Sequence, residues 1–295
     1  MLPSEWAADT RLRFSVHCFV LDLQAKSAVL ESRLRQLGRV LVAYSGGVDS
    51  AYLAWAAHQV LGSDVTAVIA DSPSLARWQL EDALRFAEEH GIHHAVITTQ
   101  ELQNADYVRN DAGRCYHCKD ELFSVMESYA AEHNFPGIAY GVNTDDLHDF
   151  RPGQQAARKH EIVAPLAEAH LSKAEIRELA RVAGLRIWQK PASPCLASRI
   201  EYGRPVTREA LAAVEKGEDA MRSLGFREFR VRHHGDIVRI EIAREELGRA
   251  LDPAMAAEFT RTFKALGFTY VTLDLAGFRS GSMNAVLPLA TLKRA

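Results

Sequence analysis

The spacing of apolar positions changes along the chain and divides it into two parts. Between about residues 39 and 141, short apolar runs alternate with segments in which apolar residues recur every three or four positions. The short runs predict buried strands, and the longer period predicts amphipathic helices. Strands that alternate with helices indicate a Rossmann-like α/β fold, a parallel sheet with helices on both faces.

Ligands bind such sheets at the carboxyl ends of the strands. The predicted strands are 39–43, 65–70, 95–98 and 137–141, and the predicted helices are 22–37, 49–61, 77–90, 119–132 and 172–184. Ser172 and Glu175 fit a capping box at the start of the last helix.

After about residue 200 the pattern becomes that of a smaller α+β unit. Helices are predicted at 208–224 and 253–266, and strands at 228–234, 237–242 and 270–275, with a hairpin turn at Gly235-Asp236. We therefore expect an N-terminal helical segment (1–37), a nucleotide-binding domain (38–199) and a C-terminal α+β domain (200–295).

Composition is that of an ordinary soluble protein. Hydrophobic residues make up 47% of the 295 residues, and the net charge of -3 gives no general reason to bind nucleic acid. The chain shows neither a secretory signal nor an apolar run of the ~20 residues that span a bilayer, so we expect a cytoplasmic protein without a membrane partner. Thiols stay reduced there. Cys18 lies in an apolar stretch and is interpreted as a packing residue.

A glycine-rich loop follows the first predicted strand and leads directly into a helix. Its residues are Ser45, Gly46, Gly47, Val48, Asp49 and Ser50. Glycines let the backbone approach a ligand, and a helix N-terminus offers free N–H groups to an anion. The lysine of a Walker A loop is missing, and a lysine-free loop fits a leaving pyrophosphate. The alternative is a serine-capped turn without a ligand.

This hexapeptide resembles the SGGxDS signature of the PP-loop ATP pyrophosphatases. The resemblance implies ATP, Mg²⁺, an adenylated intermediate and release of pyrophosphate. Ile69 and Ser72, at the end of the second predicted strand, match the segment in which such proteins hold adenine.

Three cysteines lie in two segments that each follow the predicted sheet strands. Cys115 and Cys118 form a C-x-x-C pair just before the helix 119–132, and Cys195 lies between prolines and Arg199. This spacing lets two thiolates reach one metal ion or one iron–sulfur cluster. We expect Arg114 and the helix N-terminus to lower the pKa of the two paired thiols.

Three interpretations of these cysteines are open. They are incidental packing, a structural zinc site completed by His117, and a [4Fe-4S] cluster held by Cys115, Cys118 and Cys195. We favour the cluster, because three ligands leave one iron open for sulfide, which an ATP-activating enzyme could deliver to its substrate.

Polar residues also gather at the end of the fourth predicted strand and in the C-terminal part. Asn143, Asp145, Asp146, Asp149 and Arg151 crowd the end of this strand. The acidic residues among them could hold Mg²⁺ through water or cap the next helix. Arg230 and Arg232 alternate along one strand and share a face, where two guanidinium groups suit a phosphate or a carboxylate. Arg199 could join them. The alternative for each arginine is a solvated face or an ion pair.

Five segments resemble the LarE family along nearly the whole chain from about residue 38. They are GRCYHCKDELF, YGVNTDDLHDFRPG, KPASPCLASRIEYG, FRVRHHGDIVRIEI and YVTLDLAGFRSGSMN. The resemblance implies thiolation of pyridinium-3,5-biscarboxylic acid mononucleotide, a step in making the nickel-pincer cofactor of lactate racemase. It also implies a homo-oligomer.

The family has two forms. In one, a single cysteine matching Cys195 gives up its own sulfur; in the other, three cysteines hold a cluster that can be reloaded. This chain resembles the second form. Glu218 and Glu241 align approximately with family acidic residues near the catalytic centre and are candidate metal ligands; the alternative for each is an ion pair or a solvated face. Arg279, Ser280 and Ser282 are expected to build a turn at the site.

Two rival functions remain open. A cluster-dependent tRNA thiolase would share the loop and the cysteines, but the net charge and the absence of a recognisable RNA-binding domain make tRNA an unfavoured partner. A nucleotide- or redox-sensing protein would bind ATP without releasing pyrophosphate. The sulfur donor is not identified by the sequence.

Overall fold

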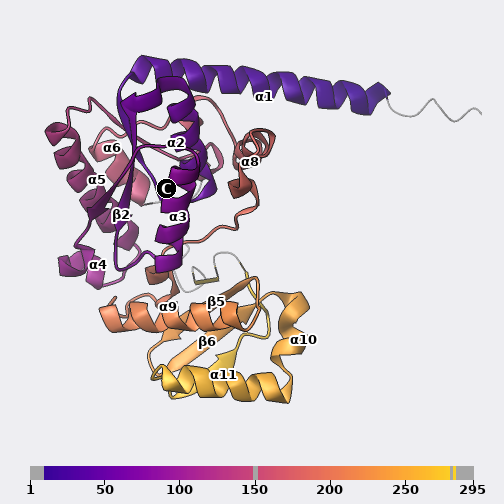
Figure 1. Ribbon diagram of the computed structural model, residues 1–295. Coiled ribbons are helices and arrows are strands. Elements are labelled where there is room, and N and C mark those ends of the chain that lie inside the picture. Colours follow the sequence, from indigo (N-terminus) through magenta and orange to yellow (C-terminus); the bar gives the residue numbers. More distant parts are fainter. Residues whose placement is uncertain (1–9, 149–151, 280–281, 284–295) are drawn as a thin grey trace, which may run out of the picture.

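The larger of two layered units holds a four-stranded parallel sheet (Figure 1). The computed structural model of the protein describes residues 10–148, 152–279 and 282–283, with side chains from residue 21 onward. The strands lie in the order β3-β2-β1-β4. Their bounds are Val40–Ala43 (β1), Val65–Asp71 (β2), His94–Thr98 (β3) and Ile138–Tyr140 (β4). All three pairings are parallel, so the four carboxyl ends meet at one edge, as the sequence predicts.

Helices cover both faces of this sheet, which confirms the predicted α/β class. The helices of the larger unit are α1 (Thr10–Leu37), α2 (Val48–Leu61), α3 (Arg77–Glu89), α4 (Ala105–Val108), α5 (Arg114–Glu132), α6 (Gly153–Lys159), α7 (Pro165–Glu168) and α8 (Lys173–Val182). One core joins β1 and β2 to α1, α2, α3 and α8, and includes Leu34, Leu53 and Ile69. The second core packs α5 and α6 against the opposite face through Phe123 and Met126. Alternate residues of each strand point to opposite faces, so both cores draw on the same strands.

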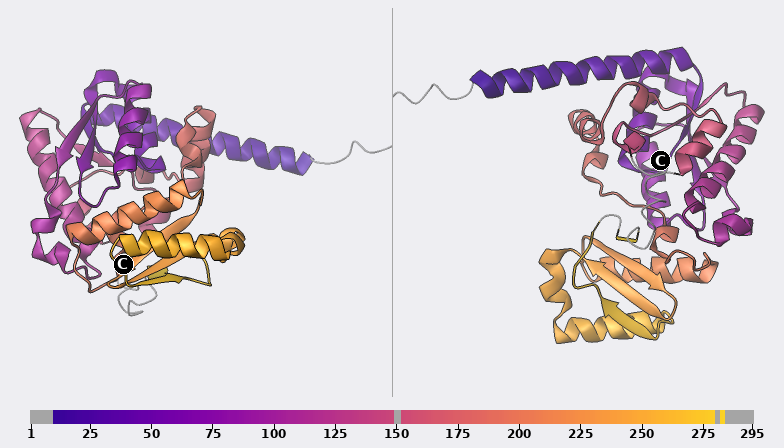
Figure 2. Two further views of the ribbon diagram at one scale, coloured as in Figure 1. Left: turned by 60° about the horizontal axis from the view of Figure 1, so that its bottom comes forward. Right: turned by 180° about the vertical axis from the view of Figure 1, so that it is seen from behind.

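The smaller unit is a three-stranded sheet with two helices across one face (Figures 1 and 2). Its elements are α9 (Arg208–Ser223), β5 (Phe229–His234), β6 (Ile237–Ile242), α10 (Leu247–Ala250), α11 (Pro253–Ala265) and β7 (Tyr270–Leu273). Strands β5 and β6 are antiparallel and β7 runs parallel to β6. Val231, Ile240 and Phe263 lie in a core of their own. The opposite face of the sheet therefore remains for polar side chains.

Two helix starts differ from the sequence prediction. Helix α5 begins at Arg114 instead of residue 119, because Gly113 precedes it as N-cap and the Asp111 carboxylate accepts the Gly113 N–H at 2.7 Å. The C-x-x-C pair thus lies inside the first turns of α5. Helix α1 begins at Thr10 instead of residue 22 and extends past the body of the larger unit (Figures 1 and 2). Over the described residues, no helix has the length and apolar character needed to cross a membrane.

Candidate active site

The phosphate loop connects β1 to α2 at the carboxyl edge of the sheet. Gly46 has a φ of +68°, and a Cβ there would lie 2.6 Å from the Cβ of Ala83, so only glycine fits. The Ser45 N–H donates to Ser50 Oγ at 3.2 Å, and Ser50 Oγ donates to the Gly47 carbonyl at 3.2 Å. These bonds hold the loop in a closed shape.

No side chain caps the N-terminus of α2. Gly47 occupies the cap position and leaves the first N–H groups of the helix to an external acceptor. The end of β4 approaches the same turn so closely that a Cβ on Gly141 would lie 2.7 Å from the Ser50 amide nitrogen. The two backbones therefore pack directly against each other, and it is the uncapped N–H groups of α2 that suit an anion.

Asp49 lies in the first turn of α2 with one carboxylate oxygen buried and without a hydrogen-bond partner. Burial raises the pKa of this carboxyl, and the nearby Asp146 raises it further, against the opposing charges of Lys173 and Arg177. An unpartnered buried carboxylate oxygen is costly unless a ligand completes it. A hard cation such as Mg²⁺ fits this oxygen.

The other acidic residues at the end of β4 divide between two roles. Asp146 exchanges hydrogen bonds with Asn143 beside Asp49, and both side chains are buried. Asp145 instead accepts the backbone N–H of Lys173 at 2.8 Å and so caps α8, together with the capping box of Ser172 and Glu175. Asp149 and Arg151 lie outside the described residues.

The predicted adenine segment lies at the end of β2. The Ile69 side chain is fully buried in the core, and Ile69 pairs with Val96 of β3, so its contact with adenine stays a prediction. Ser72 Oγ donates to the carboxylate of Glu101, a residue that no sequence motif singles out. Glu101 is 1% exposed and its second oxygen lacks a partner.

The two cysteine segments come together around Arg114. This residue is buried, and its Nη1 donates to the side-chain oxygen of Asn110 and, at 2.9 Å, to the carbonyl of Ala197. Asn110 in turn donates to the carbonyls of Glu201 and Arg204 at 2.9 and 2.8 Å. The start of α5 is therefore fastened directly to the chain that follows Cys195.

Cys118 and Cys195 pack against one hydrophobic cluster that contains Tyr107, Leu196 and Ile200. Both are half-buried, whereas Cys115 is exposed, and all three are free thiols. The predicted lowering of the thiol pKa is wrong in this structure. The protein around the Cys115 thiol reduces its hydration and raises its pKa, although the residue as a whole is exposed, and burial together with Cys195 raises the pKa of Cys118 to about 12. These effects outweigh the positive charges of Arg114 and Lys119, which act in the opposite direction.

Within the described ranges, no three His, Cys, Asp or Glu side chains are grouped closely enough to hold a metal ion. The zinc interpretation with His117 therefore lacks support in the described geometry. A cubane cluster spaces its thiolate ligands more widely than one ion does. The cluster stays a prediction.

Arg199 is buried in a bidentate pair with Glu218. Its Nε lies 2.8 Å from one carboxylate oxygen and its Nη2 lies 3.3 Å from the other. Its remaining Nη1 donates to the carbonyls of Pro194 and Cys195 at 2.6 and 3.1 Å. With these donors engaged, Arg199 positions the backbone of Cys195, while its predicted contact with substrate remains untested.

Arg230 and Arg232 differ in whether a carboxylate pairs with the guanidinium group. Arg232 donates to the fully buried Glu241 at 2.8 Å and to Ser282 Oγ at 2.9 Å, and its Nε is buried without a partner. Arg230 donates to the carbonyls of Phe229 and Ala192. Burial and the neighbouring Arg199 lower the pKa of Arg230 to about 10. Its charge is therefore the less compensated of the two.

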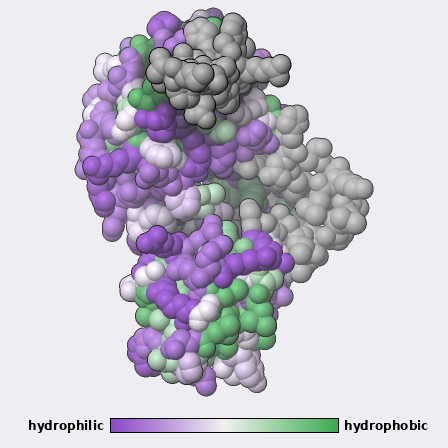
Figure 3. All heavy atoms as spheres, turned by 90° about the vertical axis from the view of Figure 1, so that its right-hand side faces the viewer, coloured by the Kyte–Doolittle hydropathy of each residue, from purple (hydrophilic) through white to green (hydrophobic). Residues whose placement is uncertain are grey.

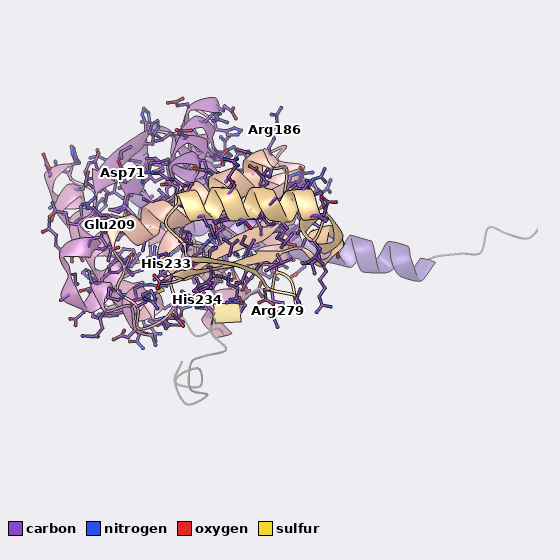
Figure 4. All side chains as sticks on the ribbon, turned by 90° about the horizontal axis from the view of Figure 1, so that it is seen from below. Asp71, Arg186, Glu209, His233, His234 and Arg279 are labelled. Atoms are coloured by element: carbon purple, nitrogen blue, oxygen red, sulfur yellow. The ribbon has the colours of Figure 1, made fainter. Side chains whose placement is uncertain are left out.

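Glu218 and Glu241 each face a guanidinium group, and Glu241 also lies 2.9 Å from Arg239. Their predicted role as metal ligands remains a prediction. In the view of Figure 4, Arg279 lies on the same side of α11 as His233 and His234 of β5. Ser280 lies outside the described residues.

A separate cavity of about 480 Å³ opens beyond the ends of β2 and β3. Asp71, Thr98 and Gln100 line it from the larger unit, and Arg208, Leu211 and Glu215 line it from α9. None of the predicted site residues lines it. Figure 3, which views another face, shows mainly polar side chains on the larger unit and a gathering of apolar ones on the smaller unit.

The parallel sheet, the lysine-free Ser-Gly-Gly loop and the uncapped helix behind it define an enzyme fold of the PP-loop type. No family model matches the chain. It is 38% identical over 271 residues to the pyridinium-3,5-bisthiocarboxylic acid mononucleotide synthase of Lactiplantibacillus plantarum, covering 92% of this chain and 98% of that protein. The chain therefore belongs to the LarE family of that synthase, as its sequence motifs indicate.

Two further relatives are similar to this chain, one over nearly its full length and one over about half of it. An uncharacterized protein of Synechocystis is 42% identical over 265 residues, which cover 90% of this chain and 99% of that protein. A glutamine-hydrolysing GMP synthase polypeptide of Thermoplasma acidophilum is 28% identical over 181 residues, 55% of this chain and 57% of that protein. The second match lies within the PP-loop superfamily expected from the loop.

Proposed function

We propose that this enzyme is an ATP-dependent sulfurtransferase that converts a carboxylate of pyridinium-3,5-biscarboxylic acid mononucleotide to a thiocarboxylate. The observation that carries the proposal is the near full-length similarity to a synthase named for the bisthiocarboxylic product. The loop and the cysteine segments of this chain supply the groups that such a reaction requires. The product would serve synthesis of a nickel-pincer cofactor.

The proposed reaction has two steps, adenylation of the carboxylate and attack by sulfide. A substrate carboxylate oxygen attacks the α-phosphorus of ATP, forming an acyl adenylate as the bond to pyrophosphate breaks. Sulfide then attacks the acyl carbon, and AMP leaves with the original carboxylate oxygen. The uncapped N–H groups of α2 and the hydroxyls of Ser45 and Ser50 would bind pyrophosphate, and Asp49 would hold Mg²⁺.

Arg230 would bind the phosphate or the second carboxylate of the substrate, since its charge is poorly compensated. Arg232 would assist through its unpartnered Nε, with Glu241 holding its orientation. Arg199 would keep the carbonyl of Cys195 in place.

Cys115, Cys118 and Cys195 would hold a [4Fe-4S] cluster, which carries sulfide on its open iron when bound. Support comes from Arg114, which ties the two cysteine segments together, and from the shared apolar wall behind Cys118 and Cys195. Coordination to iron would release the protons of these thiols to solvent and so offset their raised pKa values. We further propose a cytoplasmic homo-oligomer, in keeping with the family resemblance.

The test is an anaerobic incubation of the iron- and sulfide-reconstituted protein with MgATP and a sulfide source. Pyridinium dicarboxylate mononucleotide is supplied in one set and bulk tRNA in another, and pyrophosphate and products are followed by mass spectrometry. Pyrophosphate and a thiocarboxylate with the small nucleotide alone are expected. Formation of thiolated tRNA would instead make tRNA the substrate. ATP binding without release of pyrophosphate in either set would favour a sensor.

A further inference from the structure

The phosphate loop contains donors but no cation of its own. Its residues from Ser45 to Ser50 offer hydroxyls and backbone N–H groups, while Asp49 adds a negative charge. Pyrophosphate carries several negative charges, and a site for it needs positive charge beyond N–H dipoles. The sequence provides no basic side chain within the loop, so Mg²⁺ and any basic side chain that reaches the loop from elsewhere in the chain would supply this charge.

Lys190 makes this approach from 144 residues further along the chain. Its Nζ donates to the carbonyl of Gly46 at 2.9 Å and forms an ion pair with Asp82. The ammonium also lies 5.8 Å from the ring centroid of Trp78. Only 14% of the lysine side chain is exposed. A cation is thus held against the backbone of the glycine that shapes the phosphate loop.

The backbone of Lys190 is fixed by another basic residue. Arg177 of α8 donates to the carbonyl of Lys190 at 2.7 Å and to that of Trp188. The positive charge of Arg177 also reaches Asp49, where it acts to lower the carboxyl pKa. Lys190 is therefore anchored at its backbone but retains a long side chain, whose ammonium can exchange one acceptor for another.

We propose that Lys190 is the phosphate-binding lysine that the loop lacks, and that its ammonium donates to the pyrophosphate portion of a bound nucleoside triphosphate. The inference deepens the proposed function and rests on it. A phosphate oxygen is a stronger acceptor than the neutral Gly46 carbonyl, because it carries charge. The ammonium would then give up that carbonyl when pyrophosphate occupies the loop.

The same lysine lies on the segment that carries Cys195. The side-chain amide of Gln79 donates to the carbonyl of Ser193 at 3.1 Å, and the N–H of Leu196 donates to the carbonyl of Ser74 at 2.8 Å. This segment is thus held between its two prolines and again directly after Cys195. Lys190 thereby connects the phosphate loop with the segment that ends at the cysteine.

A purely structural role makes a different prediction. If Lys190 serves only to stabilise the fold by pairing with Asp82, then removing either partner of that ion pair should have the same consequence. If it binds pyrophosphate, only loss of the lysine should weaken the ligand. Asp82→Asn frees the ammonium from a competing carboxylate, so pyrophosphate should bind as well as before or more tightly.

The experiment measures binding of inorganic pyrophosphate and, separately, of AMP by calorimetry in the presence of Mg²⁺. The full chain is compared with Lys190→Met, Lys190→Arg and Asp82→Asn, after thermal unfolding has verified that each variant is folded. Loss of one hydrogen bond to a charged group should weaken pyrophosphate binding by Lys190→Met about ten- to a hundredfold. AMP affinity should change by less than about threefold, and Lys190→Arg should recover part of the loss.

Two results would overturn the assignment while leaving the proposed function intact. One is unchanged pyrophosphate affinity in Lys190→Met, and the other is an equal loss in Lys190→Met and Asp82→Asn. A wild-type protein that binds neither pyrophosphate nor AMP would instead overturn the proposed function itself, and the role of Lys190 with it.

Discussion

The guanidinium of Arg114 donates a 2.9 Å hydrogen bond to the carbonyl oxygen of Ala197, across 83 residues of sequence. Arg114 precedes the C-x-x-C pair by one residue, and Ala197 follows Cys195 by two. The bond therefore fixes the distance between two segments that the proposed function requires to act together. Because Arg114 is buried, water cannot substitute for its partners.

Arg114→Met should separate the cysteine segments. We expect sulfur transfer to fall at least about tenfold and the free energy of unfolding to fall by about 2 kcal/mol or more, since two buried bonds to a charged group are lost. Pyrophosphate affinity should change little. Product formation and urea denaturation measure the two effects.

Arg109→Met is the matched control, because Arg109 pairs with Asp106 and Asp111 on the surface. Exposed ion pairs contribute little to stability, so this variant should resemble the wild type. Equal losses in both variants would argue against a specific role for Arg114.

Cys195→Ala should abolish thiolation while leaving ATP binding intact. The iron content of the reconstituted protein and its visible absorption should also fall, because only two of three ligands remain. Cys18→Ala should keep both properties. Normal iron content in Cys195→Ala would remove this residue from the predicted cluster, and retained sulfur transfer would remove it from the reaction.

Asp49→Asn should suppress Mg²⁺-dependent release of pyrophosphate by about a hundredfold or more, because the neutral amide is a weak ligand for a hard cation. Stability at neutral pH should not fall, since the substitution removes a buried carboxylate whose pKa burial raises. Pyrophosphate release is followed by a coupled assay and stability by thermal unfolding. Wild-type release rates would mean that the loop has been misassigned.

Arg230→Ala should raise the KM for the pyridinium mononucleotide about tenfold or more, with a smaller effect on the KM for ATP. The reason is loss of a half-buried guanidinium whose charge is opposed by Arg199 and Arg232 and only partly offset by Glu218 and Glu228. Arg227→Ala, at an exposed position, is the control. An unchanged KM in Arg230→Ala would assign substrate binding to other residues.

Asp274 offers a test by pH. Burial acts to raise its pKa, but the Ala276 N–H and the Arg239 guanidinium outweigh burial and hold the pKa below its ordinary value of 3.8. The stabilisation is therefore present above that value and is lost as pH falls through the native pKa. Asp274→Asn should be less stable than the wild type at pH 7, by about 1–3 kcal/mol. That difference should shrink towards acid pH in urea titrations, and a gap independent of pH would contradict the ion-pair explanation.

The sequence determined the local features of this protein. The apolar spacing located the four strands of the larger sheet, because a strand repeats every two residues and a helix about every 3.6. The serine and glycines of the loop, the capping box at Ser172 and the C-x-x-C pair are also patterns within a few residues. Family membership followed from such segments, since each keeps its residue types together along the chain.

Only the tertiary structure decided which groups meet and how strongly they are hydrated. The sequence contains Arg199 and Glu218, or Lys190 and Gly46, without any local sign that they pair. The expected low pKa of Cys118 was wrong for the same reason, since proximity to a helix N-terminus is readable locally but burial is not. Hydration and long-range charge depend on surfaces that come together in the folded chain, and no spacing along the sequence specifies them.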